Sequence, residues 1–145
     1  MDEARGRPLI VLEDSDEDFD TLREAAQMLG RHNQIHRAAT GEDCLALLRT
    51  AAPQPAMVLL DLNTPGMDGR GALREIKEDP ALRGLPVVIL TTSSNPRDVA
   101  FCYGAGANAY HVKPTRYPEH LQVLQSLLGY WLSSVVLPYR EHTLT

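Results

Sequence analysis

The sequence predicts a doubly wound α/β fold built around a five-stranded parallel sheet. Short apolar runs alternate five times with segments whose apolar residues recur at helical spacing. The runs are continuously apolar, which is typical of strands that helices bury on both faces. Because crossovers between parallel strands are right-handed, we expect helices on both faces and all strand carboxyl ends at one edge.

The composition fits one globular domain. The chain has 145 residues, of which 43% are hydrophobic and 23% charged. The net charge of -5 and the scattered positions of the 14 Lys and Arg argue against nucleic-acid binding. Residues 1–8 are polar, no run approaches the roughly 18 apolar residues of a membrane span, and Cys44 and Cys102 fit buried free thiols rather than a disulfide. We therefore expect a cytoplasmic protein with no nucleic-acid or membrane partner.

Capping and turn residues divide the first half of the chain into strands and helices. Residues 15–18 can cap a helix whose apolar positions recur every three or four residues until Gly30. Thr40 or Gly41 can begin a second helix, which prolines at 53 and 55 end. The expected elements are a strand at 9–12, a helix from 15–18 to 30, a short strand at 35–39, a helix from 40 or 41 that stops before 53, and a strand at 58–60.

The second half continues the alternation. Asp79-Pro80 stops one helix, while Asn95-Pro96 combines an N-cap with a proline at the first helical position of the next. The expected elements are a helix at 69–78, a strand at 85–90, a helix from 96 to 104 or 106, a strand at 109–112, and a last helix from 117 to about 133.

Polar residues follow four of the expected strands. Glu13 and Asp14 follow the first, Asp61 the third, Thr91 the fourth and Lys113 the fifth. Because the strand ends share one edge, we expect these side chains to lie close together. Carboxylates gathered in a small volume repel one another, and hard oxygen ligands suit Mg²⁺. The pattern indicates a magnesium site at this edge of the sheet.

Each of these residues also has a plainer interpretation. Asp61 can be a turn former or an N-cap, and the acids at 13–14 can favour the positive end of the following helix. Thr91 and Lys113 can be ordinary strand-end residues. The joint spacing of the set favours a shared site.

Four features of this edge occur at a recognisable spacing. They are the acidic pair Glu13-Asp14, the run Leu-Asn-Thr-Pro-Gly-Met-Asp-Gly after Asp61, Thr91 thirty residues after Asp61, and Lys113-Pro114 twenty-two residues after Thr91. In these features the chain resembles the receiver domain of two-component response regulators over nearly its whole length. The resemblance implies the flavodoxin-like (βα)5 receiver fold.

The resemblance also implies a phosphoryl acceptor and a metal site. Asp61 would accept a phosphoryl group from a phosphohistidine of a sensor histidine kinase. Asp14, Asp61 and the backbone carbonyl of Asn63 would hold Mg²⁺, and Glu13 would act through a metal-bound water. The chain would catalyse its own phosphotransfer and autodephosphorylation rather than turn over a separate substrate.

Further roles concern the phosphoryl group and the output. Lys113 would pair with the phosphoryl group, and the Thr91 hydroxyl would donate a hydrogen bond to one of its oxygens. Asn63 and Ser93 would influence the lifetime of the acyl phosphate. Tyr110 would turn inward as Thr91 moves, changing the surface of the fourth helix, fifth strand and fifth helix. The alternative for Tyr110 is an edge-strand aromatic that packs for stability.

The C-terminal part differs from a minimal receiver domain. From His120 through Tyr139 there is no Asp, Glu, Lys or Arg, and apolar residues occupy two helical stripes. We therefore expect a receiver domain at 1–132 and an apolar dimerisation tail at 133–145. The alternative is a tail folded back on its own domain.

The tail and the loop that begins Asp61-Leu-Asn-Thr-Pro resemble the stand-alone regulators that serve bacterial phytochrome histidine kinases. This resemblance implies a phytochrome partner and a homodimer. The implied interface residues are Phe101, Tyr130, Trp131 and Leu137.

Three function classes can be compared on the sequence. The predicted class is a response regulator phosphorylated on Asp61. A non-phosphorylated receiver-like adaptor that only binds proteins is disfavoured by the complete set of site residues. A small hydrolase or flavin carrier is disfavoured because the chain has little room for substrate-contacting insertions and the acids at 13–18 would repel a flavin phosphate.

Overall fold

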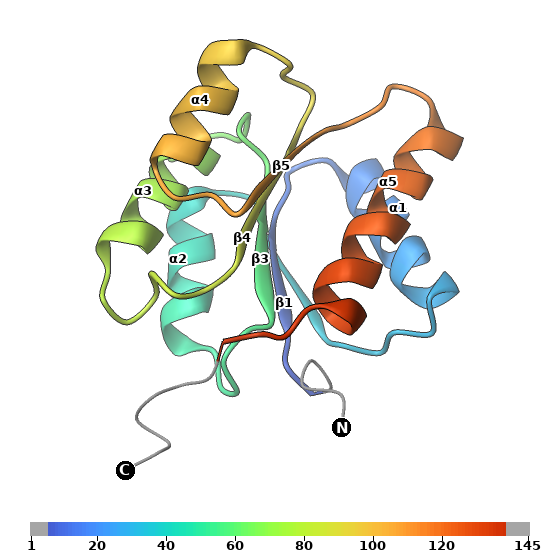
Figure 1. The fold of residues 1–145 in the computed structure, drawn as a ribbon, viewed down its shortest axis with the longest axis horizontal. Helices are drawn as coiled ribbons and strands as arrows, with labels where there is room; N and C mark the ends of the chain where they lie inside the picture. Colours follow the sequence, from blue (N-terminus) through green and yellow to red (C-terminus); the bar gives the residue numbers. More distant parts are fainter. Residues whose placement is uncertain (1–5, 139–145) are drawn as a thin grey trace.

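The computed structural model describes residues 6–138 and contains the expected five-stranded parallel sheet between two layers of helices (Figure 1). The strand order is β2-β1-β3-β4-β5. In chain order the elements are β1 (Leu9–Leu12), α1 (Asp16–Met28), β2 (Ile35–Ala38), α2 (Gly41–Thr50), β3 (Met57–Leu60), α3 (Gly69–Glu78), β4 (Val87–Thr91), α4 (Pro96–Gly104), β5 (Ala109–Val112), α5 (Tyr117–Gly129) and the π-helix η1 (Tyr130–Ser134).

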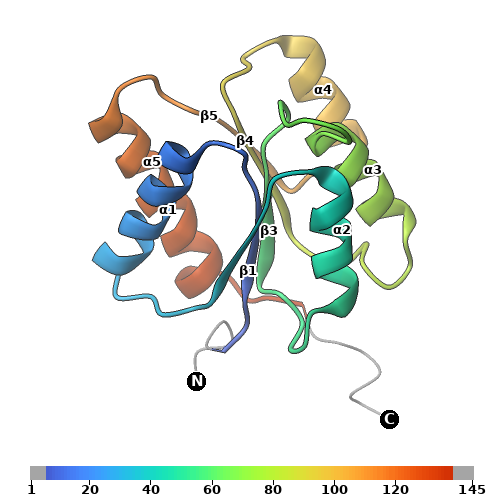
Figure 2. The same ribbon diagram turned by 180° about the vertical axis from the view of Figure 1, so that it is seen from behind.

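Helices cover both faces of the sheet. Helices α1 and α5 lie on one face and α2, α3 and α4 on the other, as Figures 1 and 2 show from opposite sides. Alternate residues of each central strand therefore enter different cores: Leu9 and Val11 of β1 face α1 and α5, while Ile10 and Leu12 face α2 and α3. The strand order reverses between β1 and β3, so the crevice that such sheets offer to ligands lies at the carboxyl ends of these two strands.

Local caps fix where the helices begin. The Ser15 side chain accepts a hydrogen bond from the Asp18 backbone N–H at 3.2 Å, and the Asp68 side chain accepts from Arg70 and Gly71. Gly69 is required for a close approach, because a Cβ at this position would collide with the backbone carbonyl oxygen of Asp61. The start of α3 is thereby placed directly behind the end of β3.

Most boundaries lie within one or two residues of the sequence prediction, and two of the differences have a clear physical cause. The fourth strand begins at Val87 rather than residue 85, because Pro86 has no N–H to donate to the ladder, although its carbonyl accepts from Val58 at 2.9 Å. The last α-helix ends at Gly129, and the chain continues as one π-helical stretch in which Val135 N–H donates to the Tyr130 carbonyl at 2.9 Å. This wider turn brings Leu132 into the core.

The described part of the tail packs against its own domain. Leu137 is 2% exposed and belongs to the core beneath α1 and α5, together with Leu132 and the partly buried Val135. The sequence placed Leu137 in a dimer interface, whereas in the single chain its side chain is buried in the chain's own core, so its contact with a second copy stays a prediction. Residues 139–145 of the expected tail lie outside the described residues.

Other predictions concern the thiols and membrane spans. Cys44 and Cys102 are both buried and free, as expected, and burial raises the pKa of the Cys44 thiol to about 12. Across residues 6–138, no helix is both long and apolar enough to cross a bilayer.

The burial of Leu137 predicts a cost for its truncation. Leu137→Ala should lower the free energy of unfolding by about 2–4 kcal/mol, because a buried leucine leaves a cavity or exposed apolar surface. The neighbouring Val136 is 77% exposed, so Val136→Ala should change the free energy of unfolding by less than about 0.5 kcal/mol. Urea unfolding followed by circular dichroism measures both. Equal effects of the two variants would contradict docking of the tail.

Candidate functional site

The predicted site residues meet at the carboxyl ends of the central strands. Glu13 follows β1, Asp61 follows β3, Thr91 ends β4 and Lys113 follows β5. Backbone hydrogen bonds continue past the strand ends and hold these residues in register: Asp61 N–H donates to the Leu12 carbonyl at 3.1 Å, and Lys113 N–H to the Thr91 carbonyl at 2.6 Å. The backbone of the site is therefore an extension of the sheet.

Three carboxylates form an acidic cluster, which we define as Glu13, Asp14 and Asp61. Their ligand oxygens all lie within 4.8 Å of one another. Glu13 and Asp61 are buried, whereas Asp14 is exposed. Asn63 lies in the loop after Asp61, and its backbone N–H donates to Asp61 Oδ1 at 3.1 Å. A set of hard oxygen ligands, closely spaced and open to solvent on one side, fits a divalent cation such as Mg²⁺ or Mn²⁺.

Lys113 is the cation of the site and is almost fully buried. Its Nζ donates to Glu13 Oε1 at 2.7 Å, to Asp18 Oδ2 at 2.8 Å and to Asp61 Oδ2 at 2.9 Å. Burial alone would lower the pKa of Lys113, but its hydrogen bonds to Asp18 and Glu13 and the charge of Asp61 raise it above its ordinary value. The side chain therefore remains an ammonium ion inside the site.

For the carboxyl group of Glu13, the effect of burial on the pKa outweighs the effect of the neighbouring charge. Burial raises the pKa of Glu13 above its ordinary value, and the hydrogen bond and charge of Lys113 only partly oppose that rise. Glu13 Oε2 also accepts from the Ser15 backbone N–H at 3.1 Å. Glu13 is thus a carboxylate whose ionised form depends on the neighbouring ammonium.

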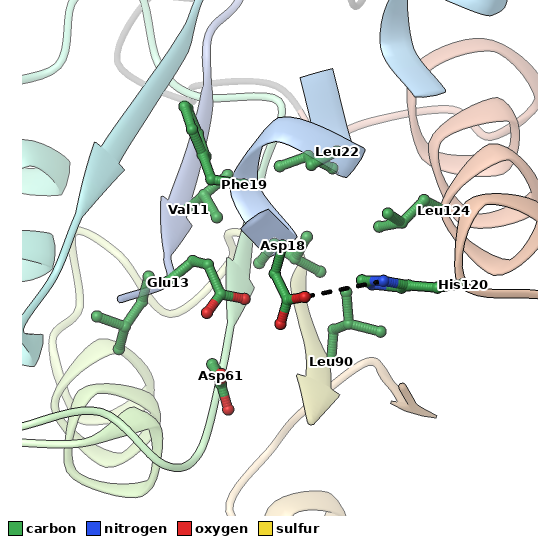
Figure 3. A pocket seen from close by; sticks show the side chains of 11 residues that line it. Val11, Glu13, Asp18, Phe19, Leu22, Asp61, Leu90, His120 and Leu124 are labelled. Carbon is green, nitrogen blue, oxygen red and sulfur yellow. Dashed lines mark ion pairs between the residues drawn. The ribbon is translucent and has the colours of Figure 1, made fainter. Parts of the chain in front are cut away.

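Asp18 is a contact of Lys113 that the sequence did not reveal, because Asp18 stands among the capping acids at the start of α1. It lies in the first turn of α1, and Figure 3 shows it between Glu13 and His120. A sequence signal for it exists: Asp18 stands four and seven residues before Leu22 and Ala25, the buried residues on the inner face of α1. An acid in register with an apolar helical face is a candidate for an internal contact.

Thr91 and Tyr110 are linked through the loop after β4. Thr91 is fully buried, and its Oγ1 accepts from the Asn63 side-chain amide and from the Ser93 backbone N–H, each at 3.4 Å. The Tyr110 hydroxyl donates to the Ser93 carbonyl at 2.8 Å. Ser93 therefore connects the threonine beside the acidic cluster to the tyrosine on β5.

A second connection to this loop was not foreseen. The Ser93 hydroxyl donates to Asp98 Oδ2, and the Arg70 guanidinium donates to Asp98 Oδ1 and to the Leu62 carbonyl. These hydrogen bonds from Ser93 and Arg70 hold the pKa of Asp98 below its ordinary value. The ion pair between Arg70 and Asp98 joins the start of α3 to the start of α4. The two residues are 28 positions apart, so no local sequence pattern reveals their contact.

The residues expected at a dimer interface differ in exposure. Tyr130 is 52% exposed, and its ring meets that of Trp131 edge to face with centroids 5.0 Å apart. Trp131 and Phe101 are partly buried, and the Arg74 guanidinium lies over the Phe101 ring. Together with the burial of Leu137, this leaves Tyr130 as the member with most free surface.

The geometry around Lys113 predicts a pH-dependent loss of stability on its removal. In metal-free buffer at neutral pH, Lys113→Met should lower the free energy of unfolding by about 3 kcal/mol, because three carboxylates lose their cation. The exposed control Arg97→Met should change it by less than about 0.5 kcal/mol. Urea titrations of both variants provide the measurement.

The pH dependence of this loss follows from Glu13. Its pKa is raised in the folded protein, and removal of Lys113 takes away contributions that lower it. A carboxyl group with a raised pKa binds its proton more tightly in the folded state, so protonation restores stability as the pH falls through that pKa. The deficit of Lys113→Met should therefore be largest at neutral pH and become smaller as the pH is lowered. A deficit that does not change with pH would contradict repulsion between the carboxylates.

Comparison with known proteins identifies the family. Residues 9–125 match the response regulator receiver domain. Response regulator Rcp1 of Synechocystis sp. is 33% identical over 135 residues, covering 90% of this chain and 92% of Rcp1. The Mn(2+)-bound form of Rcp1 superposes with a TM-score of 0.86, covering 92% of this chain and 99% of that structure.

Two further solved structures carry the same likeness. The phosphorylated cyanobacterial phytochrome response regulator RcpA is 33% identical, with a TM-score of 0.87 over 92% of this chain and 99% of its own. The bacteriophytochrome response regulator AtBRR is 30% identical, with a TM-score of 0.69 over 92% of this chain and 98% of its own.

The match to AtBRR thus spans 98% of that structure, so all three relatives are aligned over almost their whole length. The likeness covers the sheet, both helical layers and the strand ends that carry the acidic cluster. It also agrees with the resemblance found in the sequence motifs around Asp61. The chain belongs to the response regulator receiver domain family.

Proposed function

We propose that this chain accepts a phosphoryl group onto the Asp61 carboxylate from the phosphohistidine of a sensor histidine kinase. The observation that carries the proposal is the position of Asp61, with one oxygen 2.9 Å from the Lys113 ammonium and within the acidic cluster. The relatives support it, since one is described as Mn(2+)-bound and another as phosphorylated. Glu13, Asp14, Asp61 and Asn63 are proposed to hold Mg²⁺.

The proposed transfer is a direct displacement at phosphorus. A carboxylate oxygen of Asp61 forms the new P–O bond, the P–N bond to the kinase histidine breaks, and its electron pair returns to the imidazole nitrogen. Lys113 passes from the Asp61 oxygen to an oxygen of the arriving phosphoryl group, offsetting its negative charge. Bound Mg²⁺ would add positive charge at the same oxygens. No separate base is needed, because a carboxylate nucleophile has no proton to lose when it attacks.

The output is proposed to pass from Thr91 to Tyr110. The Thr91 hydroxyl can donate a hydrogen bond to a phosphoryl oxygen. The movement of Thr91 would shift Ser93, whose backbone N–H donates a hydrogen bond to Thr91 Oγ1. The hydrogen bond from Tyr110 to the Ser93 carbonyl would then break, so that the ring can turn inward. The surface formed by α4, β5 and α5 would change as a result.

The partners are proposed from the relatives' descriptions. RcpA is described as a phytochrome response regulator and AtBRR as a bacteriophytochrome one, so a bacterial phytochrome kinase is the proposed phosphoryl donor. A cytoplasmic location and a homodimer that uses Tyr130 belong to the same proposal. The domain boundary at 132 stays part of the proposal: the family match ends at residue 125, and Leu137 beyond the boundary packs on the same core.

The acceptor chemistry can be tested by intact-protein mass spectrometry. Incubation with acetyl phosphate and Mg²⁺ should add about 80 Da, the mass of one phosphoryl group, and the adduct should be absent from Asp61→Asn and from a sample with chelator. Asp43→Asn, an exposed acid on α2, should be labelled like the unaltered protein. Absence of any adduct under these conditions would favour the protein-binding adaptor instead.

The homodimer can be tested at Tyr130. Size-exclusion chromatography with light scattering should give a dimer for the unaltered chain and a larger monomer fraction for Tyr130→Ser, because the variant loses exposed aromatic surface. Tyr117→Ser is the matched control, since Tyr117 is 50% exposed at the other end of α5. Equal behaviour of both variants would remove Tyr130 from the interface, and a monomeric unaltered chain would overturn the dimer.

A further inference from the structure

Lys113 is held by one carboxylate that neither accepts the phosphoryl group nor belongs to the acidic cluster. Asp18 Oδ2 accepts from Lys113 Nζ at 2.8 Å, as closely as Glu13 and Asp61 do. Asp18 lies on α1, whereas the other two contacts follow strands of the sheet. Lys113 therefore donates hydrogen bonds to a residue of the helical layer as well as to residues that follow strands of the sheet.

Two neighbours besides Lys113, Ser15 and His120, lie against Asp18. The Ser15 side chain accepts from its backbone N–H, and the Ser15 N–H donates to Glu13, so one short segment carries both carboxylates that face Lys113 from this side. Behind Asp18, the buried His120 of α5 places Nδ1 4.0 Å from Asp18 Oδ1, too far for a hydrogen bond (Figure 3). One Asp18 oxygen is thus committed to Lys113 while the other faces the His120 ring.

We infer that Asp18 is a positioning residue for phosphoryl transfer, which holds the Lys113 ammonium while it changes partner from Asp61 to the phosphoryl group. The inference rests on the proposed function of Asp61. It adds a residue of α1 to the machinery that the strand ends supply.

The need for such a residue follows from the change at Asp61. Once an Asp61 oxygen bonds to phosphorus, it no longer offers Lys113 a free carboxylate charge. Glu13 is proposed to serve the metal, so Asp18 is the remaining ionic contact that the reaction leaves unaltered. A lysine has a flexible four-carbon stem, and a fixed contact reduces the number of positions that its ammonium can take. Asp18 therefore keeps Nζ within reach of the arriving phosphoryl group.

A plainer role for Asp18 would be that of an acid in the first turn of α1, where negative charge favours the positive end of the helix. Asp16 and Glu17 supply the same charge in the same turn. Asp20 lies on this helix too, but it is exposed and pairs only loosely with Arg23 at 3.9 Å. Asp20 is therefore a matched control for loss of one negative charge from α1.

The test measures the rate of phosphorylation by acetyl phosphate with saturating Mg²⁺ in the full chain. Asp18→Asn, which keeps the shape and removes the charge, should lower the rate constant about tenfold, as expected for loss of a hydrogen bond between charged groups. Asp18→Glu, which restores the charge, should recover most of the rate. Asp20→Asn should match the unaltered protein. The Mg²⁺ dissociation constant, measured by calorimetry, should stay close to that of Asp20→Asn in both Asp18 variants.

The outcomes separate the inference from the proposed function. Failure of the unaltered protein to become phosphorylated would refute the function itself. If the unaltered protein reacts but Asp18→Asn reacts equally fast, the positioning role is wrong. It is also wrong if Asp18→Glu is as slow as Asp18→Asn, or if the slower rate is matched by weaker Mg²⁺ binding. Slowing by Asp18→Asn alone, with recovery in Asp18→Glu and unchanged Mg²⁺ affinity, supports it.

Discussion

One buried ammonium among carboxylates is the interaction on which the site depends. Lys113 lies between Glu13, Asp18 and Asp61, and without it these acids would face one another in a region from which most water is excluded. The ammonium supplies a positive charge beside Asp61, the proposed phosphoryl acceptor, at the end of a buried strand. An incoming anion could not approach Asp61 easily if this negative charge were left uncompensated.

The sheet supplies the positions that this interaction requires. Because β1 and β3 are neighbours where the strand order reverses, their carboxyl ends open into one crevice without helix cover. Lys113 follows the edge strand β5 and reaches the centre through its long side chain. The rigid part of the site is thus backbone, and the adjustable part is a single lysine stem. The loop after β4, held by Ser93 and Asp98, connects this centre to the surface of α4 and β5.

Sequence reasoning succeeded where local signals and burial agree. The limits of β1, α3 and β5 match the prediction, because capping residues, turn residues and apolar runs all mark the same boundaries. The meeting of Glu13, Asp61, Thr91 and Lys113 followed from strand ends that share one edge. The family followed from the resemblance of the motifs that these residues belong to. The motifs are visible in short stretches of sequence, and the parallel topology then brings their residues to one edge of the sheet.

The remaining features depend on contacts between distant segments. The start of β4 depends on which backbone N–H groups can donate to the neighbouring strand, and Pro86 has no N–H to donate. Burial of Leu137 depends on a change of helical type after Gly129, and an apolar stripe does not distinguish a partner's surface from the chain's own core. Asp18 looked like a capping acid because its ion partner stands 95 residues away.

The π-helix after α5 has a consequence for how this chain tolerates changes of length. A π-helical turn holds one residue more than an α-helical turn, so η1 behaves as a single-residue insertion absorbed within the helix. Each residue of an α-helix turns the chain by about 100°, so removing one residue from 130–134 would rotate the whole following segment by that amount. Leu137 would then point away from the sheet, even if the residue removed were Ser133 or Ser134 and every apolar side chain were kept. The register of this segment, more than its composition, decides whether its apolar side chains are interior or surface.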